Sequence, residues 1–241
     1  MNTIEKKIDA KLILSIIAAG IMSFSGVVVE TAMNVTFPTL MKEFNIDTST
    51  VQWITTGYLL VLACIIPASS YLKKRFTTKS LFVTAICLFI IGTVMAAAAP
   101  VFSLLLAGRL IQGIGTGIAL PLMFNIVLEQ VPEERLGLMM GIASLITAMA
   151  PAVGPSIGGL IVNNFGWRMI FIALLPGCLA GAVLSPVSGR FIDRFGAQRP
   201  ILFGNVCIIG ALFCFSVFSG SLAAVPAIIF YLFFALGQGF S

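Results

Sequence analysis

Histidine is absent from all 241 residues of this chain. Imidazole is the commonest general base and the commonest metal ligand in proteins, so its absence argues against hydrolytic chemistry. Ser156 stands in a Gly-Pro-Ser-Ile-Gly-Gly run, but the chain holds no histidine that would activate it as a nucleophile. We therefore interpret Ser156 as a helix-packing residue and expect that the protein is not an enzyme.

Charge is also scarce, since Asp, Glu, Lys and Arg make up only 10% of the residues, against about 25% in soluble domains. Hydrophobic residues make up 59%. This composition predicts an all-α polytopic membrane protein. The five cysteines lie in apolar stretches, without the spacing of metal ligands or of disulfide frameworks. A phosphate-binding loop of the form Gly-x-x-x-x-Gly-Lys-Ser/Thr is missing too, which argues against ATP-driven pumping.

Eight apolar stretches approach or exceed the ~20 residues that a helix needs to cross a bilayer. The predicted spans are 12–34, 51–72, 80–99, 102–128, 137–162, 167–188, 200–219 and 223–241. The net charge of +5 comes from bases that cluster between spans, so it indicates topology and not nucleic-acid binding. With the amino terminus inside, eleven of the 14 bases fall on the cytoplasmic side. The positive-inside rule then predicts that both termini face the cytoplasm.

The fifth span carries an unusual cluster of two prolines and three glycines between residues 150 and 159. Such residues break an ordinary helix, but a bilayer tolerates them where packed neighbours satisfy the freed backbone groups. We expect this segment to lie where helices approach closely and bend or slide. Segments of that kind are typical of a moving membrane protein, and here they favour a carrier.

A short internal repeat supports the same class of protein. Residues 66–76 align with residues 185–195 at a constant offset of 119, and a proline, an arginine and a phenylalanine coincide. Both copies would run in the same direction through the membrane. Parallel repeats of this kind build the two halves of large transporters.

Four segments carry further motifs, in order along the chain. They are Glu30–Pro38 in the first span, Arg109–Gly115 in the fourth, Gly141 with Pro151–Gly159 in the fifth, and Gly189–Arg199 after the sixth. These segments resemble the major facilitator superfamily, and more closely its fourteen-helix drug:proton antiporter branch. The resemblance implies a bundle of two helical halves in the bacterial plasma membrane. It also implies a proton-coupled secondary transporter that exports amphipathic drugs or other small hydrophobic compounds, driven by the proton gradient and without a cofactor.

The resemblance also suggests a domain division. Residues 1–174 would form the six-helix amino-terminal half, with its sixth helix fused to the next segment. Residues 175–241 would form part of the other half, equivalent to its second to fourth helices. About eight spans are fewer than this family has, so we hypothesise an internally deleted and truncated transporter. The alternatives are a compact carrier completed as a homodimer and a membrane fragment that does not transport.

Glu30 and Arg109 are the two ionisable residues placed well inside predicted spans, where a charge costs at least about 2.5–3.5 kcal/mol. The resemblance implies that they couple proton movement to transport. A fixed ion pair and a contact with substrate alone are the alternatives. Six polar or soft side chains nearby are candidates for the substrate cavity or for plain helix packing. They are Thr31, Met33, Asn34, Tyr58, Gln112 and Phe124.

Two further groups of residues follow from the resemblance. The conformational motif of the fifth span comprises Gly141, Pro151, Gly154, Pro155, Gly158 and Gly159. The cytoplasmic loop motif comprises Gly189, Asp193, Arg194, Gly196 and Arg199, in which Asp193 either takes part in gating or caps the next helix. The expected partners are a small amphipathic substrate, protons and the lipid bilayer. We expect no metal site and no nucleic acid.

Overall fold

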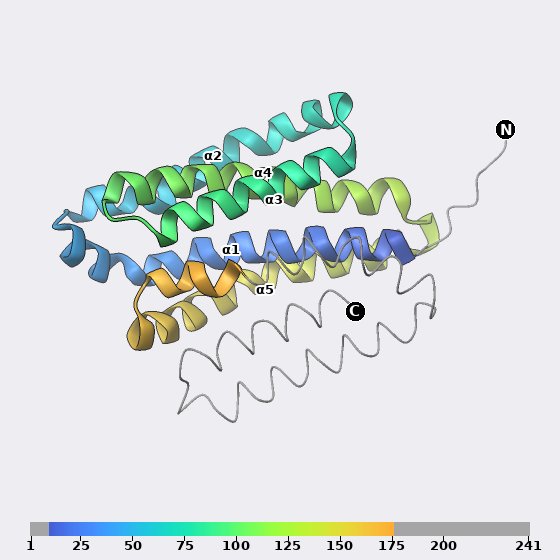
Figure 1. The fold of residues 1–241 in the computed structure, drawn as a ribbon. Helices are drawn as coiled ribbons and strands as arrows, with labels where there is room; N and C mark the ends of the chain where they lie inside the picture. Colours follow the sequence, from blue (N-terminus) through green and yellow to red (C-terminus); the bar gives the residue numbers. More distant parts are fainter. Residues whose placement is uncertain (1–9, 176–241) are drawn as a thin grey trace.

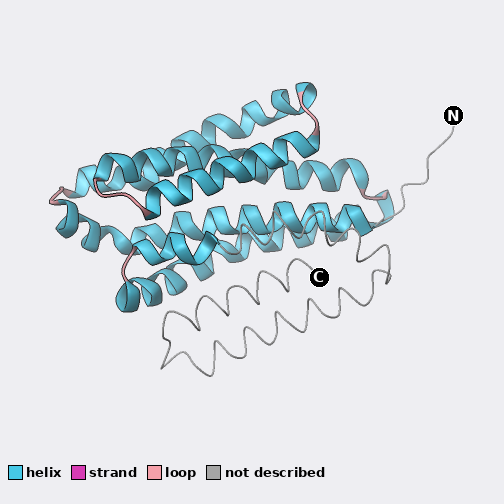
Figure 2. Cartoon of the chain, viewed as in Figure 1, coloured by secondary structure: helices cyan, strands magenta, loops and turns pink. Residues whose placement is uncertain are grey.

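The computed structural model of this chain describes residues 10–175, and helices are the regular elements of that part (Figures 1 and 2). Five of them are long and apolar enough to cross a membrane. They are α1 (Ala10–Phe44), α2 (Thr48–Arg75), α3 (Thr78–Ala97), α4 (Phe102–Gln130) and α5 (Glu133–Phe165). The chain is helical again over residues 168–175. The all-helical membrane class predicted from composition is therefore confirmed for the described residues.

The predicted spans match α2 to α5 to within a few residues, but the first span is wrong at its outer end. The prediction stopped at residue 34, before Pro38, whereas α1 continues to Phe44. A proline removes one backbone donor, and packed neighbours can compensate for that loss inside a membrane. Leu40 is fully buried two residues beyond Pro38 and anchors the last turns of α1. The predicted spans 200–219 and 223–241, and most of 167–188, lie outside the described residues.

Short connections with specific caps join the helices. Asp47 precedes α2 and accepts a hydrogen bond from the backbone N–H of Thr50 at 2.9 Å. Thr77 precedes α3 and accepts from the N–H of Ser80 at 3.2 Å. Asn45, between α1 and α2, has a φ of 51°, a left-handed conformation that asparagine tolerates better than most residues. Connections this short make consecutive helices antiparallel neighbours.

The first helix lies in the middle of the bundle (Figure 1). On one side of α1, α4 packs against α2 and α3, and on the opposite side lies α5. As a result α1 is the most buried of the five apolar helices, while α2 and α5 are the most exposed. The two exposed helices present large apolar side chains, including Trp53, Leu60, Leu138, Leu145 and Met149. Such surfaces suit contact with lipid or with another helical segment.

Two apolar clusters lie at different levels along the bundle. One cluster, called the inner cluster, lies at the end of the bundle where α1 begins. It joins the first turns of α1 to α3, to the second half of α4 and to Ala143 of α5. The other, called the outer cluster, lies at the end of the bundle where α1 ends. It joins the second half of α1 to α2, to Leu105 of α4 and to Trp167. Between the two levels, α4 carries the buried polar residues Arg109, Gln112 and Thr116. The core of this bundle therefore changes from apolar to polar and back along one helix.

At the outer level, an ion pair and a group of aromatic rings connect α1 to the helix that follows α5. Glu43 accepts a hydrogen bond from Trp167 Nε1 at 2.7 Å and another from Arg168 Nη1 at 2.6 Å. Arg168 also donates to the carbonyl of Ala99 at 3.0 Å, in the connection between α3 and α4. The Trp167 ring packs against Phe44, with ring centroids 5.9 Å apart. This arrangement fastens three connections together at one end of the bundle.

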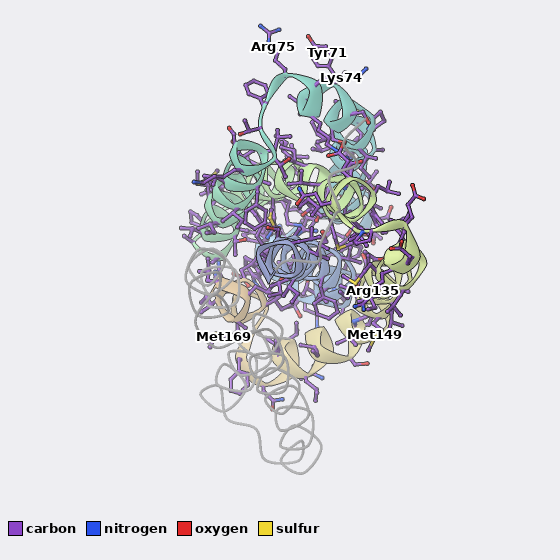
Figure 3. The ribbon with its side chains drawn as sticks, turned by 90° about the vertical axis from the view of Figure 1, so that its right-hand side faces the viewer. Tyr71, Lys74, Arg75, Arg135, Met149 and Met169 are labelled. Carbon is purple, nitrogen blue, oxygen red and sulfur yellow. The ribbon has the colours of Figure 1, made fainter. Side chains whose placement is uncertain are left out.

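Basic side chains gather at the opposite end, which Figure 3 shows face-on. Tyr71, Lys74 and Arg75 project from the end of α2 at one edge of this face, and Arg135 lies on α5 across the bundle (Figure 3). Lys73 pairs with Glu129 and so ties the end of α2 to the end of α4. Among the bases whose side chains the structure describes, Arg109 lies inside the bundle, five lie near this end and two near the other. They are Lys73, Lys74, Arg75, Lys79 and Arg135, against Lys42 and Arg168.

Candidate functional site

The buried polar site lies where α1, α2 and α4 meet. Arg109 of α4 is fully buried, which is rare for a charged side chain in any protein. Its Nη1 donates to Gln112 Oε1, one turn along α4, at 2.5 Å. Its Cζ lies 4.1 Å from the centroid of the Tyr58 ring, so the guanidinium rests on an aromatic face. The remaining nitrogens, Nε and Nη2, have no hydrogen-bond partner among residues 10–175.

A chain of hydrogen bonds determines how Gln112 is oriented. Thr93 of α3 donates its hydroxyl proton to the carbonyl of Phe89 at 2.6 Å, so its oxygen is free to accept. Gln112 Nε2 donates to that oxygen at 2.8 Å. The amide oxygen of Gln112 must then face Arg109, and it accepts the arginine's N–H. Gln112 is fully buried, so in this arrangement its side chain binds Arg109 and is not exposed at the protein surface.

Glu30 is half-buried on α1, and its charge and that of Arg109 attract each other across the interface between α1 and α4. The two side chains are not hydrogen-bonded, because the arginine nitrogens other than Nη1 are unpaired and Nη1 is bound to Gln112. The two charged residues singled out in the sequence thus lie near enough for their charges to attract each other, but they form no hydrogen bond or ion pair.

One turn outward from Glu30, Asn34 is exposed on α1. Its side-chain oxygen accepts a hydrogen bond from the hydroxyl of Thr55 on α2 at 2.9 Å. The bond leaves the amide donors of Asn34 available on the same helix face as Glu30, since residues four apart lie one above the other. Of the six residues predicted for a substrate cavity, Asn34 is the one that is exposed in the structure.

The other predicted cavity residues are covered to different degrees. Met33, Tyr58 and Gln112 are fully buried. Phe124 is half-buried against the inner apolar cluster. Thr31 is half-buried, and its hydroxyl donates back to the carbonyl of Val27 at 3.0 Å. A cavity role for these residues stays a prediction, and only a different arrangement of the helices would expose the fully buried ones.

The proline–glycine cluster forms part of a continuous helix, because α5 runs unbroken through Pro151 and Pro155. Both prolines are exposed, whereas Gly154 and Gly158 are buried against α1. A Cβ added at Gly158 would lie 2.8 Å from Ala32 Cβ, and one at Gly154 would collide with Thr31. Gly141 has no neighbour within 4 Å of such an atom. The glycines four residues apart therefore let α1 and α5 approach closely.

The loop motif Gly189–Arg199 and the predicted carboxy-terminal half lie outside the described residues, as does the expected contact between the fifth span and the stretch from residue 176 to 186. In the part of the chain that is described, no three side chains of the histidine, cysteine, aspartate or glutamate type come together as metal ligands. Thr55, Thr93 and Thr116 belong to the polar site but were not predicted. Threonine in a membrane helix usually bonds to its own backbone, so its sequence position carried no signal.

Comparison with known proteins decides the family. The family model described as Major Facilitator Superfamily matches residues 16–185. The chain belongs to this superfamily. It is therefore a multi-pass membrane protein, and the resemblance read from its four motifs is confirmed.

Relatives within the superfamily include named resistance proteins. The chain is 46% identical over 165 residues to the lincomycin resistance protein LmrB of Bacillus subtilis, an alignment that covers 68% of this chain and 34% of LmrB. It is 37% identical over 189 residues to the MFS-type transporter YcnB of the same organism, covering 78% and 40% of the two chains. A multidrug resistance protein B homolog of Mycobacterium tuberculosis is 32% identical over 182 residues, covering 76% and 33%. The chain thus spans about a third of the length of these superfamily members.

Proposed function

We propose that this chain carries the proton site and part of the transport path of a superfamily exporter, which exchanges protons for small amphipathic drugs. The family membership and the resistance proteins among the relatives support a drug transporter. The proton-coupling role is argued from one observation above all. Arg109 is fully buried with two unpaired nitrogens while Glu30, whose charge attracts it, makes no hydrogen bond to it.

The chemistry of the pair supports exchange. A nearby arginine favours the ionised form of a carboxyl group, whereas burial away from water favours the protonated form. If Glu30 moves onto the open donors of Arg109, it releases a proton, and if it moves away it can take one up. A change in helix packing that alters this separation would thus change the proton affinity of the site.

The alternative of a permanent ion pair accounts less well for the arrangement. A fixed pair would stabilise the bundle only with its hydrogen bonds made, because each unsatisfied buried donor costs about 1–3 kcal/mol. The Nε and Nη2 donors of Arg109 are instead unpaired within the described part of the chain. The second alternative is a membrane fragment that inserts but cannot alternate between two access states, and a transport assay separates it from the first proposal.

We further propose how cargo and topology fit this site. Asn34 offers amide donors beside Glu30, so a bound drug with hydrogen-bond acceptors would compete for the same space as the protonated acid. The basic end of the bundle is proposed to face the cytoplasm, with both chain termini on that side. Residues 1–174 are proposed as the amino-terminal half and residues 175–241 as part of the other half.

The test is transport by the purified full chain in lipid vesicles under an imposed pH gradient, with lincomycin as the first cargo because relatives are named for it. The proposal expects lincomycin movement that follows the gradient and is abolished in Glu30→Gln. Glu134→Gln is the matched control, since it makes the same acid-to-amide change at an exposed position in the first turn of α5. Inserted, folded protein that moves no cargo under any gradient would favour the non-transporting fragment. Gradient-driven transport that persists in Glu30→Gln would rule out the proton role of this acid.

A further inference from the structure

Tyr58 is a fully buried tyrosine for which the proposed exchange has no role as yet. It was grouped with the cavity residues on sequence grounds, but its side chain has no exposed surface to offer a cargo. A buried phenol needs a partner for its hydroxyl. The Tyr58 hydroxyl lies 3.1 Å from the carbonyl of Gly26 on α1 and 2.8 Å from Thr116 Oγ1 on α4. The hydroxyl of Tyr58, a residue of α2, therefore bridges α1 and α4.

The two ends of Tyr58 contact the two sides of the charged pair. Its ring face lies 4.1 Å from the guanidinium carbon of Arg109, a cation–π contact in a site without water access. Its hydroxyl meets the carbonyl of Gly26, which is the backbone acceptor for the N–H of Glu30 in a regular α-helix. Tyr58 thus touches the arginine directly and the turn of α1 that presents the acid.

Helices α1 and α4 approach closely where the Tyr58 hydroxyl bridges them. A Cβ added at Gly26 would lie 2.5 Å from Thr116 Cγ2, so the Thr116 side chain of α4 already packs against the backbone of α1 there. One turn along α1 from Gly26 and two turns along α4 from Thr116, Glu30 and Arg109 are nevertheless not hydrogen-bonded to each other. Arg109 is held instead by the Tyr58 ring and by Gln112.

We propose that Tyr58 is a positioning residue that holds Arg109 back from Glu30, so that the acid can accept a proton, and that it does not contact cargo in this state. This inference rests on the proposed function of the pair. No other described ionisable group competes for the role around Glu30. On α5 the charged residues are Glu133, Glu134 and Arg135, roughly 28–32 Å along the helix from Gly154, which packs beside Thr31. On α2 they are Lys73, Lys74 and Arg75 in the last turn, and on α4 Glu129 is the charged residue besides Arg109 and lies next to the end of that helix.

The experiment follows protonation of Glu30 itself, by infrared absorption of the protonated carboxyl group in the purified full chain over a range of pH. The band that disappears in Glu30→Gln identifies the group. In Tyr58→Leu the guanidinium loses its aromatic support and can turn toward the acid. We expect at least a tenfold loss of proton affinity, seen as a titration midpoint lower by about one pH unit or more. Tyr58→Phe keeps the ring and loses the hydroxyl, so a smaller shift in the same direction is expected.

Phe171→Leu is the matched control, because Phe171 is an equally buried aromatic residue in the outer cluster. It should lower thermal stability without moving the Glu30 midpoint. A midpoint that is unchanged or raised in both Tyr58 variants would overturn the inference. So would a tenfold loss of lincomycin binding at every pH in Tyr58→Phe without a shift in midpoint, since that result indicates a cargo contact. Failure of Glu30→Gln to stop gradient-driven transport would count against the proposed function and would leave the titration readout interpretable.

Discussion

The contact between α1 and α5 leads to a sharp prediction about four glycines of one helix. Gly154 and Gly158 face α1, whereas Gly141 and Gly159 belong to the same motif and do not press on a neighbour. We expect Gly158→Ala to destabilise the protein. The new Cβ would lie 2.8 Å from Ala32 Cβ and 2.9 Å from Ala32 Cα. Carbon atoms in good contact are about 3.5–4.0 Å apart, so α5 must move outward by roughly 0.6–1.2 Å.

The cost follows from that displacement. Overpacking of a well-packed interface costs about 1–3 kcal/mol, and we expect about 2 kcal/mol for Gly158→Ala. Gly154→Ala should cost a similar amount, because its new methyl group meets Thr31 and approaches the carbonyl of Val28 to 3.0 Å. One outward shift of α5 relieves both clashes. The double variant should therefore cost clearly less than the sum of the single variants.

The control variants are Gly141→Ala and Gly159→Ala. A methyl group at Gly141 meets nothing within 4 Å, and one at Gly159 makes an ordinary contact of 3.8 Å with Val35. Alanine is also the better helix former, so these changes should be neutral or stabilise by at most about 1 kcal/mol.

Reversible unfolding of the full chain in mixed micelles, followed by tryptophan fluorescence, gives the free energies. If all four variants unfold alike, the close packing of α1 on α5 is not what holds these helices together.

Three further predictions concern the ends of the bundle. Asp47→Ala should lower the thermal midpoint of unfolding at neutral pH, whereas Asp47→Asn keeps the helix cap. Hydrogen bonds from Thr50 and Ser49 lower the pKa of Asp47 below its ordinary 3.8, so the ionised cap stabilises the protein above that value. The difference in thermal midpoint between wild type and Asp47→Ala should therefore vanish as the pH falls through the lowered pKa. Trp167→Phe keeps the stacked ring but loses the bond to Glu43, and chemical unfolding should report a loss of about 1 kcal/mol. In a Glu43→Ala background, where the acceptor is already absent, Trp167→Phe should cause no further loss from this bond. In a cysteine-free background, a membrane-impermeant maleimide added to intact cells should label Thr48→Cys and spare Gln130→Cys. Thr48 begins α2 and Gln130 ends α4, at opposite ends of the bundle. Labelling of Gln130→Cys with Thr48→Cys spared would contradict the proposed orientation.

Much of the fold could be predicted because the bilayer permits so few solutions. A spanning chain must satisfy its backbone internally, so each apolar stretch of sufficient length is a helix. The boundaries of α2, α3 and α4 followed from that rule. The end of α1 at Phe44 did not, because the predicted span ended at residue 34, and the burial of Leu40 that accompanies the continued helix is not visible in the sequence.

The candidate site, too, could be predicted from the sequence in part only. Glu30 and Arg109 stood out in the sequence because a charge inside a membrane span is costly wherever the helices turn. That cost is local to each residue and needs no knowledge of its neighbours. Composition and charge alone therefore determined the membrane class, the succession of helices and the two charged residues of the candidate site.

Only the tertiary structure decided what each of these residues touches. Rotation of α2 about its own axis buries Tyr58 between Arg109 and Gly26 instead of exposing it to a cavity. The crossing of α1 and α5 selects Gly154 and Gly158 from a longer run of small residues. These choices depend on how helices far apart in sequence pack, and a pattern along a single helix does not contain that information.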